Sequence, residues 1–208
     1  MAGPFYVLVV LGQGLLRPGF DLVRDDASLL SNGAWGWIQV VNFMVTGAMV
    51  LACSAGVWRA LTEGRGIRWA PVLLGIYGVG LIGAGIFAAD PMNGFPSGTA
   101  AGRPVVLTTH GILHIVSAAV GFLGLVAFCF VMARRFFADG RRGRAAWSIA
   151  TGVLFLAAFF GLASGSSSPV VVLFFWWHWS PPGHGWRARR CISTGVSMEP
   201  DDEVPRAD

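Results

Sequence analysis

The sequence predicts an all-α integral membrane helix bundle with six transmembrane helices. Its 208 residues are 54% apolar and 12% charged, with a mean hydropathy of +0.62, whereas soluble domains carry about 25% charged residues. Several uninterrupted apolar segments approach the roughly 20 residues that a helix needs to cross a bilayer core. The alternating pattern of a membrane barrel is missing, so helices remain the way to satisfy every backbone polar group in lipid.

Four apolar segments have the length of a transmembrane helix or come close to it: residues 37–58, 69–89, 105–133 and 145–163. Two flanking segments, residues 4–16 and 169–179, are short and need neighbouring residues or local bilayer thinning to complete a span. We therefore expect residues 1–180 to form a transmembrane domain. Residues 181–208 are polar and acidic, which predicts a disordered cytoplasmic tail.

The arginines predict an orientation. All fifteen basic residues are arginine, and twelve of them fall in alternate connections and in the tail, against three (Arg17, Arg24 and Arg103) in the connections between. Basic residues favour the cytoplasmic side, so six spans would place both termini in the cytoplasm. The arginines form short clusters between apolar segments, which does not indicate nucleic-acid binding. Three widely spaced cysteines indicate neither a disulfide framework nor a zinc ribbon.

Glycine and alanine recur on the third predicted helix, in the stretch "GIYGVGLIGAGIFAAD". Gly80, Ala84 and Ala88 form a row of small residues that allows a second helix to approach closely. Packing explains this row better than a ligand groove does. The glycines lie in mid-helix with no strand before them, so they do not form a nucleotide-binding loop.

Polar side chains mark two helix stripes that should face the bundle interior. Gln39, Asn42 and Thr46 share one stripe of the second span, and His110, His114 and Ser117 share one stripe of the fourth. In the assigned orientation, Asn42 and His110 lie at similar depth, roughly 7 Å below the outer boundary. Asp90 ends the third span on that side, and the first outer connection adds Asp21, Asp25, Asp26 and Ser28. The polar groups are therefore expected to converge on one outward-facing pocket bounded by the second to fourth helices.

Several interpretations of this pocket stay open, because ionisable residues inside a span usually face a partner or a cavity. The histidines and amides could simply hydrogen-bond neighbouring helices together. The pocket could bind a small ligand or lipid without cofactor, which is the leading hypothesis. Zinc held by Asp90, His110 and His114 could activate water for hydrolysis, with His178 as a further candidate ligand, although no HExxH motif is present. A carrier of protons or small solutes is the third hypothesis.

Four stretches together resemble a family of bacterial membrane proteins catalogued as domain of unknown function 998. They are "RPGFDLVRDDASLLSNGAWGWIQVVNFMVTG" at 17–47, "GAGIFAADPMNGFPSG" at 83–98, "HGILH" at 110–114 and "VMARRFFADGRRGRAAWSIATG" at 131–152. The similarity covers residues 5–165 and implies a six-helix protein of the bacterial inner membrane. The family has no assigned biochemical role, so the resemblance does not imply any particular activity.

The resemblance also implies which positions belong to the family's motifs: Asp21, Trp37, Gln39, Asn42, Asp90, Pro91, Gly94, Pro96, His110 and His114. From these and the stripes we take six candidate pocket residues, Asp21, Gln39, Asn42, Asp90, His110 and His114. The chain departs from the family where a sixth apolar helix is expected and "FFWWHWSPPGHGWRARRCISTG" stands instead.

Overall fold

The computed structural model describes residues 2–64 and 66–163, and these form helices without a β-strand. The α-helices are α1 (Ala2–Leu16), α2 (Gly36–Ala60), α3 (Trp69–Ile86), α4 (Thr109–Ala138) and α5 (Arg142–Ala163), with a 3-10 helix η1 (Ala27–Ser31) between α1 and α2. The five helices match the first five predicted spans, which confirms the all-α class. The predicted sixth span at 169–179 and the tail at 181–208 lie outside the described residues.

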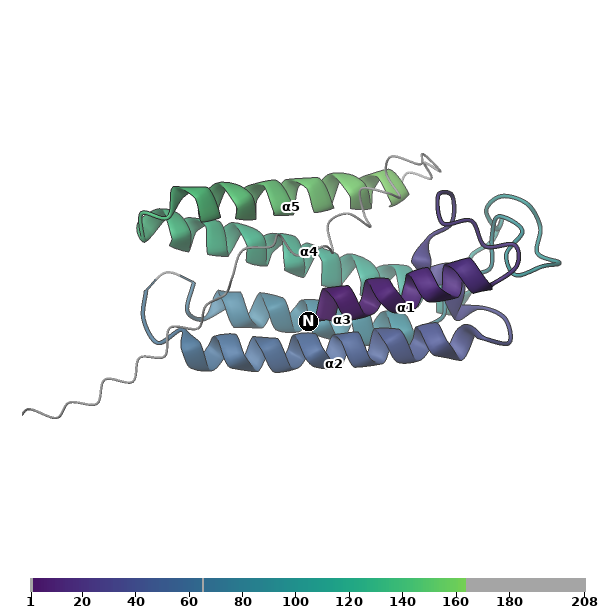
Figure 1. The fold of residues 1–208 in the computed structure, drawn as a ribbon, viewed down its shortest axis with the longest axis horizontal. Helices are drawn as coiled ribbons and strands as arrows, with labels where there is room; N and C mark the ends of the chain where they lie inside the picture. The colour runs from purple at the N-terminus through teal and green to yellow at the C-terminus, as the bar shows by residue number, and fades with distance from the viewer. Residues whose placement is uncertain (1, 65, 164–208) are drawn as a thin grey trace, which may run out of the picture.

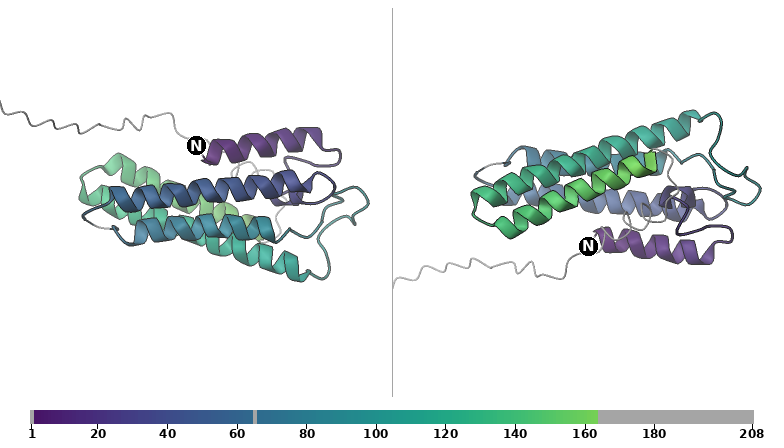
Figure 2. Two further views of the ribbon diagram at one scale, coloured as in Figure 1. Left: turned by 90° about the horizontal axis from the view of Figure 1, so that it is seen from below. Right: turned by 90° about the horizontal axis from the view of Figure 1, so that it is seen from above.

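Neighbours in sequence are also neighbours in space. Helix α3 packs against both α2 and α4, α5 packs against α4, and α1 packs against α2 (Figure 1). In this order of contacts α1 and α5 are the first and last helices, and Figure 2 shows α1 beside α2 and α5 beside α4. Consecutive helices run in opposite directions, so the α1–α2 and α3–α4 connections share one end of the bundle. The α2–α3 and α4–α5 connections share the other end.

Four of these helices, α2, α3, α4 and the Arg142–Gly161 part of α5, are long and apolar enough to cross a membrane. They are the four segments that the sequence predicts as full-length spans. Helix α1 has 15 residues and is apolar but shorter, as predicted. At about 1.5 Å per residue it extends for about 22 Å, less than a typical hydrocarbon core of about 30 Å.

The start of α4 differs from the prediction. The apolar run at 105–107 suggests a span that begins at Val105, but α4 begins at Thr109, and Val105 and Val106 are 101% and 80% exposed. Thr108 is the N-cap residue, and its side chain accepts a hydrogen bond from the backbone N–H of Gly111. The capping threonine therefore sets the helix start, and the three apolar residues before it belong to the connection.

Glycines bring the middle helices into backbone contact. A Cβ placed on Gly80 of α3 would lie 2.5 Å from the Cα of Gly121 on α4 and 2.7 Å from the carbonyl oxygen of Ser117. A Cβ on Gly47 of α2 would lie 2.8 Å from the carbonyl oxygen of Gly78 on α3. The predicted packing role of the small-residue row is thus confirmed at Gly80.

The arginines at the two ends of the bundle differ in their contacts and exposure. At the end that holds the α1–α2 connection, Arg17 donates to the carbonyl oxygens of Leu30 and Asn32, and its guanidinium lies 4.8 Å from the centre of the Phe95 ring. Arg24 forms an ion pair with Asp25, with 2.8 Å between Nε and Oδ1. Both arginines therefore hold the connection together, whereas exposed arginines such as Arg134, Arg141 and Arg144 gather at the opposite end.

Candidate functional site

A buried polar network joins α1 to α2. Gln39 is fully buried, and its Oε1 accepts hydrogen bonds from Gln13 at 2.9 Å and from Asn42 at 3.2 Å, while its Nε2 donates to the Tyr6 hydroxyl at 3.2 Å. Asn42 also donates to the backbone oxygen of Tyr6, and Thr46 donates to Asn42. The prediction that the Gln39–Asn42–Thr46 stripe faces the interior is confirmed. Its partners are on α1, so it does not lie beside Asp90 or the histidines.

The α1 side of this network is not among the residues predicted from the sequence. Tyr6, Val10 and Gln13 are all buried and recur at i, i+4 and i+7, which is the spacing of one helix face. This periodicity was the available signal, and it was obscured because the other residues of α1 are also mostly apolar. Gln39 and Asn42 therefore fasten α1 onto α2 through hydrogen bonds.

Asp90 completes the first turn of α4. Its Oδ2 accepts a hydrogen bond from the backbone N–H of Thr108 at 2.9 Å, and its Oδ1 accepts one from the Thr108 hydroxyl at 2.5 Å. A Cβ at position 111 would lie 2.1 Å from the Asp90 carboxylate, so glycine is needed there. A negative charge beside unpaired amide groups at a helix N-terminus is favourable. Both carboxylate oxygens of Asp90 thus accept hydrogen bonds at the start of α4 and stabilise it.

His114 completes the end of α3. Its Nδ1 lies 2.9 Å from the carbonyl oxygen of Ala84 and 2.8 Å from that of Phe87. Both partners are acceptors, so Nδ1 carries the hydrogen and donates to them. The last carbonyl groups of a helix have no intrahelical partner, and the buried imidazole supplies one. The prediction that His114 faces the interior is confirmed.

The same prediction is wrong for His110, which is exposed and forms a T-shaped ring contact with Phe87, with ring centres 5.8 Å apart. The reason is the later start of α4. His110 is the second residue of that helix, beside the connection that follows α3, whereas the prediction placed it farther down a span beginning at Val105. The two imidazoles therefore do not share a pocket.

The connection between α1 and α2 is organised by Asp25, which is fully buried. Its carboxylate accepts hydrogen bonds from the Arg24 guanidinium, from the backbone N–H of Asp21 and from the Asn93 amide, so it ties this connection to the one after α3. The bond with Asp25 raises the pKa of Arg24. Asp21 is exposed, and its own carboxylate accepts from the Val23 backbone N–H. Asp21 thus shapes the turn and does not enter a pocket.

These positions bear on the zinc hypothesis. Within residues 2–64 and 66–163, no three His, Cys, Asp or Glu side chains lie close enough together to hold a metal ion. Both Asp90 oxygens accept hydrogen bonds from Thr108, and His110 is exposed and does not line the cavity that His114 lines. The described geometry therefore does not support a zinc site built from Asp90, His110 and His114. The further candidate His178 falls outside the described residues.

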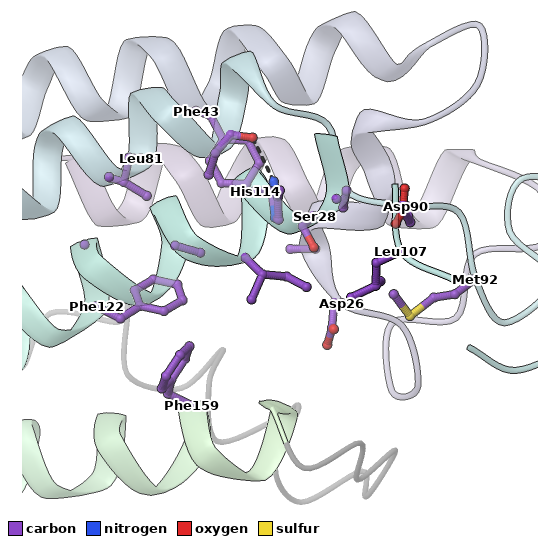
Figure 3. A pocket seen from close by; sticks show the side chains of 18 of the residues that line it. Asp26, Ser28, Phe43, Leu81, Asp90, Met92, Leu107, His114, Phe122 and Phe159 are labelled. Carbon is purple, nitrogen blue, oxygen red and sulfur yellow. Dashed lines mark hydrogen bonds between the residues drawn. The ribbon is translucent and has the colours of Figure 1, made fainter. Parts of the chain in front are cut away.

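A cavity of about 440 Å³ lies inside the bundle at the end that holds the α1–α2 and α3–α4 connections. The walls are mostly apolar and come from all five α-helices, with Tyr6, Phe43, Leu81, Ala84, Phe122 and Phe159 among them. Polar side chains gather at one end of the cavity, where Figure 3 shows Asp26 and Asp90, while Phe122 and Phe159 lie at the other. Of the six predicted pocket residues, Asp90 and His114 line it. Asp21, Gln39, Asn42 and His110 do not.

Asp26, Ser28 and Arg103 also line the polar end. Burial raises the pKa of Asp26 to about 6, the positive charge of Arg103 opposes this shift, and the neighbouring charge of Asp25 adds to it. From the sequence, Asp26 belongs to the same outer connection as Asp21 and Asp25, and no residue pattern distinguishes the three. The sequence shows the charge of Arg103, but its place beside the cavity depends on how the segment after α3 folds back.

The fold and the cavity together define a class: an all-helical protein whose long apolar helices are of the kind that cross membranes, with an internal cavity that is apolar along its walls and polar at one end. The chain belongs to the family described as "Protein of unknown function (DUF998)", which matches residues 1–184. The predicted family is therefore confirmed. No curated protein and no solved structure matches the chain significantly.

Proposed function

We propose that this protein is a multi-pass protein of the bacterial inner membrane that binds an amphiphilic ligand, a lipid or a small molecule, in its internal cavity. The observation that carries the proposal is the distribution of side chains around the cavity. Aromatic and aliphatic groups line its length, and the acidic groups of Asp26 and Asp90 collect at one end with the Ser28 hydroxyl nearby. Ligand pockets of proteins commonly combine apolar walls with a few convergent polar groups in about 300–1,000 Å³.

The arrangement favours an amphiphile over a uniformly polar solute. A polar solute would leave its hydrogen-bonding groups unpaired against Phe43, Leu81 and Phe122, which is costly away from water. An alkyl chain loses nothing there, and its head group can reach the polar side chains. Because the polar end of the cavity coincides with the bundle end that holds the two connections, the head group would lie near the membrane surface.

A large side chain that fills the cavity should abolish binding of an amphiphile such as 1-dodecanol. Ala118 lines the cavity on α4, so Ala118→Phe places a ring in it, whereas Val120→Phe enlarges a side chain on the exposed side of the same helix. With protein in phosphatidylcholine nanodiscs, we expect 1-dodecanol to raise the melting temperature of the wild type and of Val120→Phe. Ala118→Phe should show no such stabilisation.

The melting temperatures without 1-dodecanol check that both variants are folded. Equal stabilisation of Ala118→Phe and wild type would show that the alcohol binds elsewhere. An unchanged melting temperature in the wild type, at alcohol concentrations that saturate the nanodisc, would remove the proposed function.

We further propose that the end holding the α1–α2 and α3–α4 connections faces the periplasm and that both termini lie in the cytoplasm. The support is the charge asymmetry: the opposite connections carry most of the arginines, and basic residues favour the cytoplasmic side. The polar end of the cavity would then be reached from outside the cell.

Cysteine labelling tests this orientation. In a background with all three native cysteines replaced by serine, Ser97→Cys lies in the exposed segment after α3, and Asp139→Cys lies in the exposed turn after α4. A membrane-impermeant maleimide should label Ser97→Cys on spheroplasts and should label Asp139→Cys only after permeabilisation. The reverse pattern would show that the protein is inserted the other way.

A further inference from the structure

The carboxylate of Asp26 stands apart from the other acidic groups at the same end of the bundle. Asp21 accepts a hydrogen bond from Val23, Asp25 binds Arg24, and Asp90 binds Thr108. Asp26 precedes η1, but its side chain makes no capping hydrogen bond. The Asp26 side chain has no hydrogen bond or ion pair with another residue of the described ranges, and only its backbone oxygen accepts a bond, from the N–H of Leu29.

The Asp26 carboxylate lines the cavity. It is half-buried, and Figure 3 shows it at the polar end, on the same side of the cavity as Ser28. A charged carboxylate that is removed from water and has no partner is unfavourable, and the raised pKa of Asp26 expresses that cost. A ligand that brings a positive charge would therefore gain more here than at an exposed carboxylate such as Asp21.

Other charged or titratable groups lie at or near this end of the cavity: Arg103, Asp25 and Asp90, with His114 and Tyr6 farther along its wall. Arg103 is the cation whose charge lowers the pKa of Asp26, Asp25 is the anion that raises it, and Asp90 lines the same cavity. Asp25 is paired with Arg24, and both Asp90 oxygens accept hydrogen bonds from Thr108, whereas the Asp26 side chain makes no hydrogen bond within the described residues. Arg103 is exposed and forms no ion pair with Asp26, although its field reduces the attraction that a cationic ligand feels.

On the basis of the proposed function, we infer that the amphiphile taken by this cavity carries a protonated amine in its head group, and that the Asp26 carboxylate binds the amine. An ammonium group has three donors and no acceptor, so it can bond both carboxylate oxygens and the Ser28 hydroxyl. Its alkyl chain would extend along the cavity toward Phe122 and Phe159. Hydrogen bonds between charged partners are stronger than those between neutral partners. The cavity should therefore prefer an amine head group to an uncharged head group on the same alkyl chain.

A pair of probes with the same chain separates head-group recognition from chain burial. Dodecylamine and 1-dodecanol should both stabilise the wild-type protein in phosphatidylcholine nanodiscs, with the amine binding more tightly. Asp26→Asn keeps the shape of the side chain and removes its charge. It should weaken dodecylamine binding about tenfold or more, the expected loss of one charge-assisted hydrogen bond, and leave 1-dodecanol within about twofold.

Two further variants sharpen the test. Asp21→Asn removes an exposed carboxylate from the same connection and should leave the affinity for both probes unchanged. Arg103→Gln removes the cation that opposes binding and should tighten dodecylamine binding without affecting 1-dodecanol. If Asp26→Asn and Asp21→Asn weaken amine binding equally, the effect is general surface charge and the inference is wrong.

The outcomes also distinguish this inference from the proposed function. If both probes bind and the amine shows no preference, or if Asp26→Asn leaves the preference intact, the inference fails and the amphiphile cavity stands. If Asp26→Asn weakens both probes equally, Asp26 has only a structural role. If neither probe binds the wild type, the cavity is not an amphiphile site and both proposals fail together.

The pH dependence gives an independent check. The amine stays protonated well above neutral pH, so its charge is constant between pH 5 and 8. Asp26 is charged above its pKa of about 6 and neutral below it. Dodecylamine affinity should therefore fall as the pH drops through about 6 in the wild type. The Asp26→Asn profile should be flat, which separates Asp26 from His114, Asp90 and Asp25 at the same end of the bundle.

Discussion

Gly80→Ala is expected to destabilise the protein strongly, because the new methyl group has no space between α3 and α4. Its Cβ would lie 2.5 Å from the Cα of Gly121 and 2.7 Å from the carbonyl oxygen of Ser117. Both neighbours are backbone atoms, which cannot rotate away as a side chain can. The helices would have to separate, and overpacking of this kind costs about 1–3 kcal/mol and occasionally more. Thermal unfolding in nanodiscs should show a clearly lower melting temperature.

Gly56→Ala is the matched control. Gly56 also lies inside a helix, α2, but a Cβ there meets nothing within 4 Å. Alanine is favoured over glycine in a helix interior by about 0.5–1 kcal/mol, so this variant should be as stable as the wild type or slightly more stable. If the two variants unfolded at the same temperature, the backbone contact between α3 and α4 would be wrong.

His114→Phe is the second change with a large expected effect. Phenylalanine keeps a planar ring in the same place but cannot donate to the carbonyl oxygens of Ala84 and Phe87. Leaving such buried acceptors without a donor costs about 1–3 kcal/mol. The variant should therefore unfold at a lower temperature than the wild type.

His110→Phe tests whether this effect is specific. His110 is exposed and its ring touches Phe87 without a hydrogen bond to a described residue, so its replacement should change the free energy of unfolding by less than about 0.5 kcal/mol. Equal losses at positions 110 and 114 would mean that the end of α3 does not depend on the His114 imidazole.

The helices could be predicted from the sequence because their signal is local. An apolar segment of the right length between polar connections predicts a helix in lipid whatever its neighbours are, and α2, α3 and α5 lie close to their predicted ranges. The start of α4 was missed because Val105, Val106 and Leu107 satisfy hydropathy alone. The helix begins instead where Thr108 can cap it, beside the carboxylate of Asp90.

The candidate site was predicted less well because it depends on contacts between distant segments. The inward direction of Gln39 and Asn42 follows from helix periodicity, but their contact with α1 follows from which helix packs beside α2. Asp21, Asp25 and Asp26 lie close together in the α1–α2 connection. In the folded protein Asp25 forms the ion pair with Arg24, and Asp26 lines the cavity. Residue spacing carries no information on that choice.

The reciprocal contacts between α3 and α4 have a consequence for folding. Asp90, which follows α3, completes the beginning of α4, and His114 of α4 completes the end of α3. Each terminus loses hydrogen bonds when the two helices separate, so the hairpin should form and melt as one cooperative unit. Slow amide exchange should therefore persist together in the last turn of one helix and the first turn of the other, and be lost from both at once.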